Sequence, residues 1–414
     1  MSRATLILLS LAAGLIAGVA VASLAPGSAE MTIAVARPIG TLWLNGLQMT
    51  VIPLVVTLLI TGVAATAQAA QAGRIAGRAI ATFLSLDALT ASMAAIVTPL
   101  LLTLAPMPRG AGQALRAALG HAEPVAPSPP IAEFITGIVP TNIFAAATNN
   151  ALLSLILFTL AFAFAITRIE GEARDLLLRV FTAIRDAMLV LIGWVLWLAP
   201  LGVFALALVV GASAGGAAFG ALAHYIAIIA SVGIVVMLMA YGVAAIIGRT
   251  APGRFARALA PAQAVAISTQ SSLASLPAMI EGTKVLRIAP ATSGLVLPMA
   301  VAMFRATQPA MNVAVALYIA HWFGIVPDMA SVAAAVVVAI LVSLGSASLP
   351  SQITFFASIA PVCVALGVPA APLGLLIAVE TIPDIFRTLG NVSMDLAATA
   401  TVSRWSGTTG KDVP

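Results

Sequence analysis

Residues 380–395 hold the densest group of reactive side chains in the chain, Glu-Thr-Ile-Pro-Asp-Ile-Phe-Arg-Thr-Leu-Gly-Asn-Val-Ser-Met-Asp. The preceding residues 329–379 contain no Asp, Glu, Lys or Arg. A helix turning about 100° per residue would gather six polar side chains within an arc of roughly 100°: Glu380, Asp384, Arg387, Thr388, Asn391 and Asp395. Because charges are costly in a membrane helix, we expect this face to line a bundle interior or a watery cavity. The alternative is a helix end whose charges reach the headgroups.

This polar face has the chemistry to bind a small anionic carboxylate. Arg387 is always charged, and its planar guanidinium offers parallel donors to a carboxylate. Asp384 lies one turn earlier, so it could pair with Arg387 in an empty site and take an ammonium group in a loaded one. Thr388 and Asn391 lie on the same face, which favours a site that offers a ligand several contacts. The alternative is a salt bridge that binds no ligand.

The composition places this face in an all-α membrane protein. Of 414 residues, 61% are hydrophobic and 8% are charged, whereas about a quarter are charged in a typical soluble domain. The net charge of +5 comes from scattered basic residues, which do not predict a nucleic-acid partner. A single cysteine, Cys363, excludes an intrachain disulfide and a cysteine-based metal cluster. The three histidines lie far apart, so we expect no cofactor or resident metal.

Ten apolar stretches follow one another, of which eight are expected to span the membrane and two to turn back within it. They lie at about 4–24, 40–70, 79–106, 134–167, 187–211, 219–248, 258–280, 288–322, 329–367 and 369–403. With the N-terminus inside, fourteen Lys or Arg lie in cytoplasmic segments and three outside, as the positive-inside rule requires. Both termini are therefore expected in the cytoplasm of a bacterial-type inner membrane. Cleavage of the first stretch as a signal peptide is the alternative to a retained first helix.

Two of the stretches carry the same tetrapeptide, Ala-Ser-Leu-Pro, at 274–277 and at 347–350. Each stretch is interrupted by serines and a proline, which leaves arms too short to span, and irregular backbone at membrane depth must line a cavity or be buried in protein. A pair of interrupted segments indicates a transporter site between internal repeats. Two proline-kinked helices are the alternative. We expect the two tips to contribute substrate contacts from Ser271, Ser272, Ser346, Ala347 and Ser348.

Together these motifs resemble the dicarboxylate/amino acid:cation symporter family. Met49–Val55 resembles the second-helix motif of that family, Val139–Phe144 its fourth-helix entry, and Trp197–Phe204 its fifth-helix signature. The serines of the first hairpin and the pattern Asp-x-x-Arg-Thr-x-x-Asn-x-x-x-Asp, ending at Asp395, are the most specific matches. The resemblance implies a homotrimer of eight-span subunits, each with two oppositely oriented re-entrant hairpins and inverted repeats. It also implies a transport domain that moves as an elevator.

The resemblance divides the chain into scaffold and transport segments. It implies scaffold helices one and two at 1–72, transport helix three at 73–106, an external loop at 107–133, and scaffold helices four and five at 134–218. Residues 219–403 would be transport segments: helix six, the first hairpin (256–287), helix seven (288–322), the second hairpin (329–367) and helix eight (369–403). Residues 404–414 would be a cytoplasmic tail. In substrate binding, Arg387 would hold the side-chain carboxylate and Asp384 the amino group, while Asp395 and Asn391 would bind a cation.

The seventh helix departs from the family pattern, which has an unwound Asn-Met-Asp-Gly-Thr that supplies sodium ligands. Aligned through Ala316–Tyr318, this chain has Met311–Val315, in which only Asn312, after a one-residue shift, offers a side-chain oxygen. Either the alignment is displaced around Pro309, or at least one sodium site is absent. Asp87 in the third helix could replace the lost acid as a proton or cation site, or pair with Arg305. The alternative places Asp87 at a lipid or water boundary.

We therefore predict a secondary symporter that imports a small acidic amino acid with Na⁺ or H⁺. Asp384 favours an amino acid, because a substrate without an amine would leave that acid unpaired. A C4-dicarboxylate:cation symporter is the alternative. A channel-like anion conductor and a substrate sensor are further alternatives. The protein is not expected to be an enzyme, because no Gly-x-Ser-x-Gly elbow or nearby histidine activates Ser271 or Ser275.

Overall fold

The computed structural model describes residues 3–70, 73–107, 139–149, 152–346 and 351–406. Within these ranges every regular element is helical, and no strand occurs. The helices are α1 (Arg3–Leu24), α2 (Ala29–Gln48), α3 (Val51–Ala70), α4 (Arg74–Leu104), α7 (Ile143–Thr148), α8 (Leu152–Ile166), α9 (Gly171–Trp197), α10 (Ala199–Ala214) and α11 (Ala217–Ile246). They continue with α12 (Pro252–Thr269), α13 (Ser272–Val285), α14 (Pro290–Met303), α15 (Thr307–Phe323), α16 (Met329–Ser346), α17 (Ser351–Leu366), α18 (Leu373–Leu376) and α19 (Thr381–Trp405).

The all-helical class is confirmed, while the expected eight spans are only partly visible as single long helices. Four described helices are long and apolar enough to cross a bilayer, and a fifth is added if α9 and α10, bent by 55°, form one span. The second apolar stretch begins earlier than expected, at Ala29, and is interrupted at Met49 and Thr50 before α3. The predicted external loop and tail fall mostly on residues 108–138 and 407–414, which lie outside the described residues.

Within the described residues, the first hairpin is interrupted as expected, and the predicted seventh and eighth helices are each divided in two. Helices α12 and α13 pack against each other across a two-residue break at Gln270 and Ser271, with Gln270 in the left-handed conformation. Helices α16 and α17 also pack together, and the residues that join them, 347–350, lie outside the described part. The seventh helix is divided into α14 and α15, and the eighth into α18 and α19. Broken helices expose backbone groups that can take part in binding.

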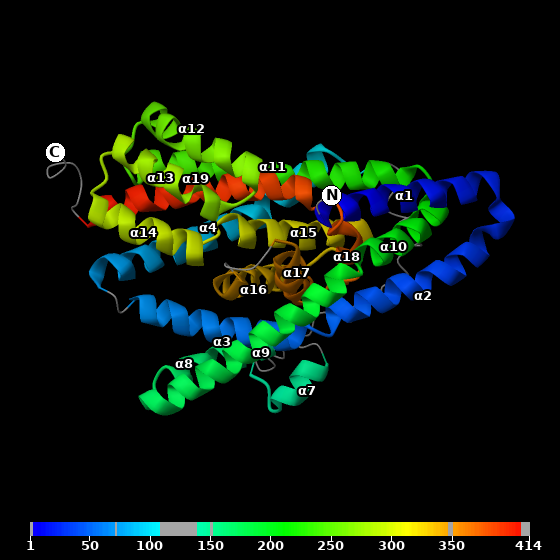
Figure 1. Ribbon diagram of the computed structural model, residues 1–414, viewed down its shortest axis with the longest axis horizontal. Coiled ribbons are helices and arrows are strands. Elements are labelled where there is room, and N and C mark those ends of the chain that lie inside the picture. The colour runs from blue at the N-terminus through cyan, green and yellow to red at the C-terminus, as the bar shows by residue number, and fades with distance from the viewer. Residues whose placement is uncertain (1–2, 71–72, 108–138, 150–151, 347–350, 407–414) are drawn as a thin grey trace.

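Helix α19 is the centre around which the second half of the chain packs. It contacts α11, α12, α13, α14, α15 and α4, which surround it in Figure 1. Its buried face is nearly continuous from Arg387 to Ser403. The charged face predicted from the sequence is therefore held inside a bundle of helices, which contradicts the alternative that its charges reach the headgroups.

A second group of helices lies away from α19, where α1 and α2 pack along α10 (Figure 1). Glycines allow α1 and α10 to approach closely. A Cβ on Gly211 would lie 2.5 Å from the carbonyl oxygen of Leu15 and 3.1 Å from the Cα of Gly18. Small residues at such crossings let two membrane helices pack backbone to backbone, where no hydrophobic effect drives their association.

We expect Gly211→Ala to destabilise the protein, because the added methyl group has no space between α10 and α1. Overpacking of this kind costs about 1–3 kcal/mol, which should lower the melting temperature of the purified protein in detergent. Gly242→Ala in α11 is the matched control, because a Cβ there meets nothing within 4 Å. Equal melting temperatures for the two variants would contradict the close contact between α1 and α10.

Candidate substrate and cation site

The buried charges of α19 form a linked group around Arg387. Its guanidinium Nη2 donates to Glu380 Oε1 at 2.6 Å, and its Nε lies 3.6 Å from Asp384 Oδ1. All three residues are at most 8% exposed. Tyr225 of α11 donates its hydroxyl to Glu380 Oε2 at 3.3 Å, which orients the second oxygen of that carboxylate. The group contains two carboxylates and one guanidinium, so with all three groups ionised it has a net charge of −1.

Glu380 is the residue that the sequence analysis left without a role. It ends the turn between α18 and α19, immediately before the first residue of α19. An acidic side chain is favoured there by the helix dipole. The spacing of seven residues to Arg387 is two helical turns, so both side chains lie on one face. The sequence shows this spacing, which places Glu380 within reach of Arg387, but it does not rank Glu380 above Asp384.

The break between α14 and α15 contacts the face of α19 that carries Arg387 and Asn391. Thr307, the first residue of α15, donates to Asn391 Oδ1 through both its backbone N–H at 3.0 Å and its hydroxyl at 2.7 Å. The hydroxyl is also within 3.0 Å of the carbonyl oxygen of Arg387. The amide of Asn391 thereby satisfies a backbone donor at a helix N-terminus, where such groups have no partner within the helix.

The position of this break corrects the alignment of the seventh helix. Residues Met311–Val315 lie inside α15 as regular helix and are buried, so they are not an unwound segment. The interruption is at Phe304–Ala306, upstream of Pro309, which agrees with the alternative that the alignment is displaced around that proline. Arg305 therefore lies in the break itself. Among the described residues it makes no ion pair shorter than 4.0 Å, so the predicted pairing with Asp87 is absent.

Three carboxylate oxygens near the break are buried and have no hydrogen-bond partner within the described part of the chain. Both oxygens of Asp395 and one of Asp87 are buried and unpartnered. Asp395 is 0% and Asp87 1% exposed, so Asp87 does not face a lipid or water boundary. An ionised carboxylate buried in this way costs several kcal/mol unless a cation or a proton neutralises it. The two residues therefore have the chemistry of a cation site.

The other predicted site residues are distributed around this group. Thr388 is buried, and its hydroxyl donates to the backbone carbonyl of Asp384 at 2.9 Å. Asn312 contacts the second hairpin rather than α19, because its Nδ2 donates to Ser358 of α17 at 3.0 Å, while its Oδ1 has no partner in the described part of the chain. Asn312 is therefore not joined to Asp395 by any described hydrogen bond.

The hairpin tips are only partly described. Ser271 is the N-cap of α13 and accepts a hydrogen bond from the backbone N–H of Ala274 at 3.2 Å. Ser271 and Ser272 are half-buried, and no described hydrogen bond joins them to Arg387. The first hairpin instead reaches α19 through Gln263, which donates to Ser393 at 3.1 Å. The predicted contacts of Ser346, Ala347 and Ser348 fall outside the residues whose side chains are described.

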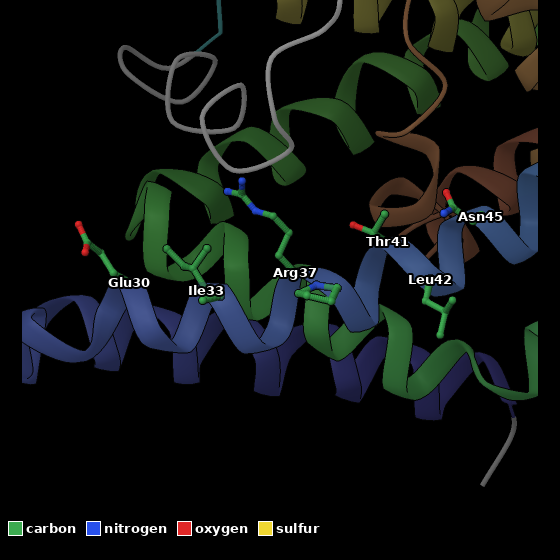
Figure 2. A pocket seen from close by; sticks show the side chains of 8 residues that line it. Glu30, Ile33, Arg37, Thr41, Leu42 and Asn45 are labelled. Atoms are coloured by element: carbon green, nitrogen blue, oxygen red, sulfur yellow. The ribbon is translucent and has the colours of Figure 1, made fainter.

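A separate surface pocket of about 670 Å³ lies along α2 and contains none of these residues. Figure 2 shows Glu30, Arg37, Thr41 and Asn45 along this helix. All of its lining residues come from α2, and the pocket is open to the outside. We assign the candidate site to the buried group on α19 because charges there are desolvated, whereas those on α2 are not.

We expect Thr307→Val to weaken the junction between the break and α19. The variant keeps the shape of the side chain but loses the hydroxyl bonds to Asn391 and to the Arg387 carbonyl, which are worth about 1–2 kcal/mol together. The melting temperature should fall, and uptake should fall several-fold. Thr401→Val is the matched control, because that buried hydroxyl bonds only to Ala397 of its own helix. A loss of uptake in the control as large as that in Thr307→Val would refute this role.

Comparison with known proteins identifies relatives over almost the whole chain. The sequence profile described as the sodium:dicarboxylate symporter family matches residues 4–405. The proton/sodium-glutamate symport protein of Bacillus subtilis is 28% identical over 95% of this chain and 91% of its own length. The proton/glutamate-aspartate symporter of Escherichia coli is 26% identical over 89% of this chain and 84% of its own. The C4-dicarboxylate transport protein of Rhizobium johnstonii is 25% identical over 89% and 83%, respectively.

Proposed function

The chain belongs to the sodium:dicarboxylate symporter family, a family of transporters and not of enzymes, and from that premise we propose that it imports a small acidic amino acid. Uptake is coupled to a gradient of Na⁺ or H⁺. The observation that carries the proposal is the buried group on α19, in which Arg387 lies between Glu380 and Asp384. The names of the two glutamate symporters and of the C4-dicarboxylate transport protein reported above give acidic substrates, which supports the same substrate class.

In this proposal Arg387 binds the side-chain carboxylate of the substrate. A guanidinium has five N–H donors, and the pair with Glu380 uses one of them. Glu380, held by Tyr225, orients the guanidinium and leaves its other donors available. Thr388 and Asn391, one turn further along α19, and the serines of the two hairpin tips complete the site.

Asp384 distinguishes the two candidate substrates. Its carboxylate lies beside Arg387 and can accept an ammonium group, which aspartate and glutamate have and succinate lacks. The group of Glu380, Asp384 and Arg387 has one negative charge in excess, so it favours a substrate that carries an ammonium group over one that carries carboxylates alone. An acidic amino acid therefore fits better than a C4-dicarboxylate, which we retain as the second candidate because of the dicarboxylate transporters among the relatives.

The cation binds at Asp395 and Asp87 in this proposal. Their unpartnered oxygens support this assignment, and Asn312 Oδ1 offers another oxygen towards the second hairpin. Oxygen ligands suit Na⁺, and a proton would neutralise the same carboxylates. The coupling is reciprocal: a cation that increases the affinity for the substrate is itself bound more tightly when the substrate is present.

As the family resemblance implies, we further propose a membrane-embedded homotrimer that works as an elevator, and the contacts within the chain support a division into two groups of helices. Helices α4, α11, α14, α15 and α19 contact one another around the site. They would move together with the first hairpin, α12 and α13, and the second hairpin, α16 and α17. Helices α1, α2, α9 and α10, with α3 and α8, would form the fixed scaffold. Large exposed apolar residues on α2, α9 and α10, including Leu42, Trp194 and Leu201, would face lipid or neighbouring subunits. We place both termini in the cytoplasm and the protein in the inner membrane.

Uptake into proteoliposomes tests this function. Labelled aspartate, glutamate and succinate are each offered under an inward Na⁺ gradient, an inward H⁺ gradient or no gradient. We expect aspartate or glutamate to accumulate above the external concentration only when a gradient is present. Unlabelled succinate should compete weakly, because it leaves Asp384 without an amine.

Three outcomes would contradict parts of the proposal. Accumulation of succinate but not of amino acids would favour the C4-dicarboxylate symporter. Flux of substrate that never exceeds the external concentration would indicate an anion-conducting channel, because a channel cannot concentrate its substrate. Binding without any flux would indicate a sensor.

A further inference from the structure

Arg305 lies at a position that is fixed from both sides by described contacts. Before it, the ring of Phe304 stacks on Phe83 of α4 with centroids 4.7 Å apart. After it, the carbonyl oxygen of Ala306 accepts a hydrogen bond from the Thr90 hydroxyl of α4 at 2.8 Å. The next residue, Thr307, is bonded to α19. Arg305 is therefore held between α4 and α19, and it is half-buried.

The two unpartnered carboxylates belong to these same helices and flank the break. Asp87 lies four residues after Phe83 and three before Thr90, so the three side chains share one face of α4, which contacts the break. Asp395 lies four residues after Asn391, the residue that holds Thr307, on the same face of α19. The geometry thus places one guanidinium and two carboxylates around a single interruption of the helix.

The charges of Arg305 and Asp395 interact without forming a described ion pair. The charges that act on Asp395 are those of Arg305 and Asp87. The charges that act on Arg305 are, in decreasing order, those of Asp384, Arg387 and Asp395. Since no described ion pair shorter than 4.0 Å includes Arg305, its charge acts on Asp395 through space. In a desolvated interior, such interactions remain strong over several ångströms.

We propose that Arg305 is a resident cation that takes the place of one transported cation at Asp87 and Asp395. Two carboxylates and one guanidinium leave one net negative charge, so one monovalent cation balances the group. Without the guanidinium, the same two carboxylates would require two monovalent cations. This inference rests on the proposed symport function and deepens it, because it makes Arg305 the residue that sets the cation stoichiometry.

The first experiment measures cation binding without requiring transport. Melting temperatures of the purified full-length protein are recorded in detergent across titrations of NaCl and LiCl, with choline chloride as the ionic-strength control. We expect Arg305→Met, which keeps the length of the side chain, to show a larger and steeper stabilisation by Na⁺ or Li⁺ than the unmodified protein. Arg305→Lys keeps the charge and should behave as the unmodified protein does.

A double variant makes the test independent of the stability of Arg305→Met. Arg305→Met with Asp395→Asn again has one net negative charge, so its salt response should return to that of the unmodified protein. If Arg305→Met cannot be purified folded, rescue of folding by the added Asp395→Asn change supports the proposal. The proposal is overturned if Arg305→Met responds to salt as the unmodified protein does, if Arg305→Lys responds as Arg305→Met does, or if the double variant is not rescued.

The second experiment measures, in proteoliposomes, the number of cations transported with each substrate molecule. The equilibrium ratio of accumulated substrate is measured against imposed Na⁺ and H⁺ gradients, and the logarithmic slope gives the number of cations per substrate. That number should rise by about one in Arg305→Met and stay constant in Arg305→Lys. An unchanged number in an active Arg305→Met would overturn the inference. If the unmodified protein accumulates no carboxylate at all, the proposed function fails, whereas the melting experiment still decides the role of Arg305.

Discussion

Arg387→Ala is expected to reduce uptake of an acidic substrate by about 100-fold or more. The variant removes the guanidinium that would hold the substrate carboxylate, and hydrogen bonds to a charged group contribute roughly 1.5–3 kcal/mol each. Two such bonds correspond to a loss of about two orders of magnitude or more, since 1.4 kcal/mol is tenfold. Initial rates of uptake in proteoliposomes, normalised to the amount of protein inserted, measure this effect.

The buried pair with Glu380 requires a control, because removal of Arg387 also leaves a buried carboxylate without its partner. Breaking a buried ion pair in this way costs about 3–5 kcal/mol of stability. Arg387→Ala combined with Glu380→Gln removes both charges of this pair, so we expect the melting temperature to recover in part, because Asp384 still lacks its guanidinium, and uptake to remain lost. Wild-type uptake of aspartate or glutamate by this double variant would disprove the assignment of Arg387.

The buried face of α19 could be predicted from the sequence because its periodicity and charge stand out against an apolar background. The sequence also indicated the interruption at residues 270–271, where serines divide a stretch too short to span twice. Glu380 lies on the predicted polar face, but its pairing with Arg387 does not follow from the sequence, because Asp384 at three residues and Glu380 at seven both lie within reach of the guanidinium. Only the three-dimensional arrangement shows that Glu380 is the closer of the two, at 2.6 Å from Arg387.

The seventh helix shows a second limit of sequence reasoning. Alignment through Ala316–Tyr318 placed the unwound segment at Met311–Val315, whereas the break lies at Phe304–Ala306. Phe304 and Arg305 carry no turn signal, and proline at position 309 is compatible with the first turn of α15. The break is stabilised instead by tertiary contacts, from Thr90 to Ala306 and from Thr307 to Asn391. Contacts between residues 84 to 216 positions apart in the chain cannot be read from local patterns.

Asp395→Asn is expected to uncouple transport from the cation gradient. The substitution is nearly isosteric and removes one of the two unpartnered carboxylates, so that the remaining charges of Asp87 and Arg305 balance each other. No cation is then needed for neutrality. Exchange of labelled for unlabelled substrate should continue, while accumulation driven by Na⁺ or H⁺ should fall to the level seen without a gradient.

Asp186→Asn is the matched control for this substitution, because Asp186 is an exposed residue of α9 that pairs with Arg185 at the surface. Its removal should leave both exchange and gradient-driven accumulation unchanged, since exposed pairs contribute about 0–1 kcal/mol. The stability of Asp395→Asn in cation-free detergent should exceed that of the unmodified protein, because a buried carboxylate without a partner is replaced by a neutral amide. If Asp395→Asn still accumulates substrate with its cation dependence unchanged, the coupling cation does not bind at Asp395. The unpartnered oxygens would then have to be neutralised by a proton that remains in place throughout the transport cycle.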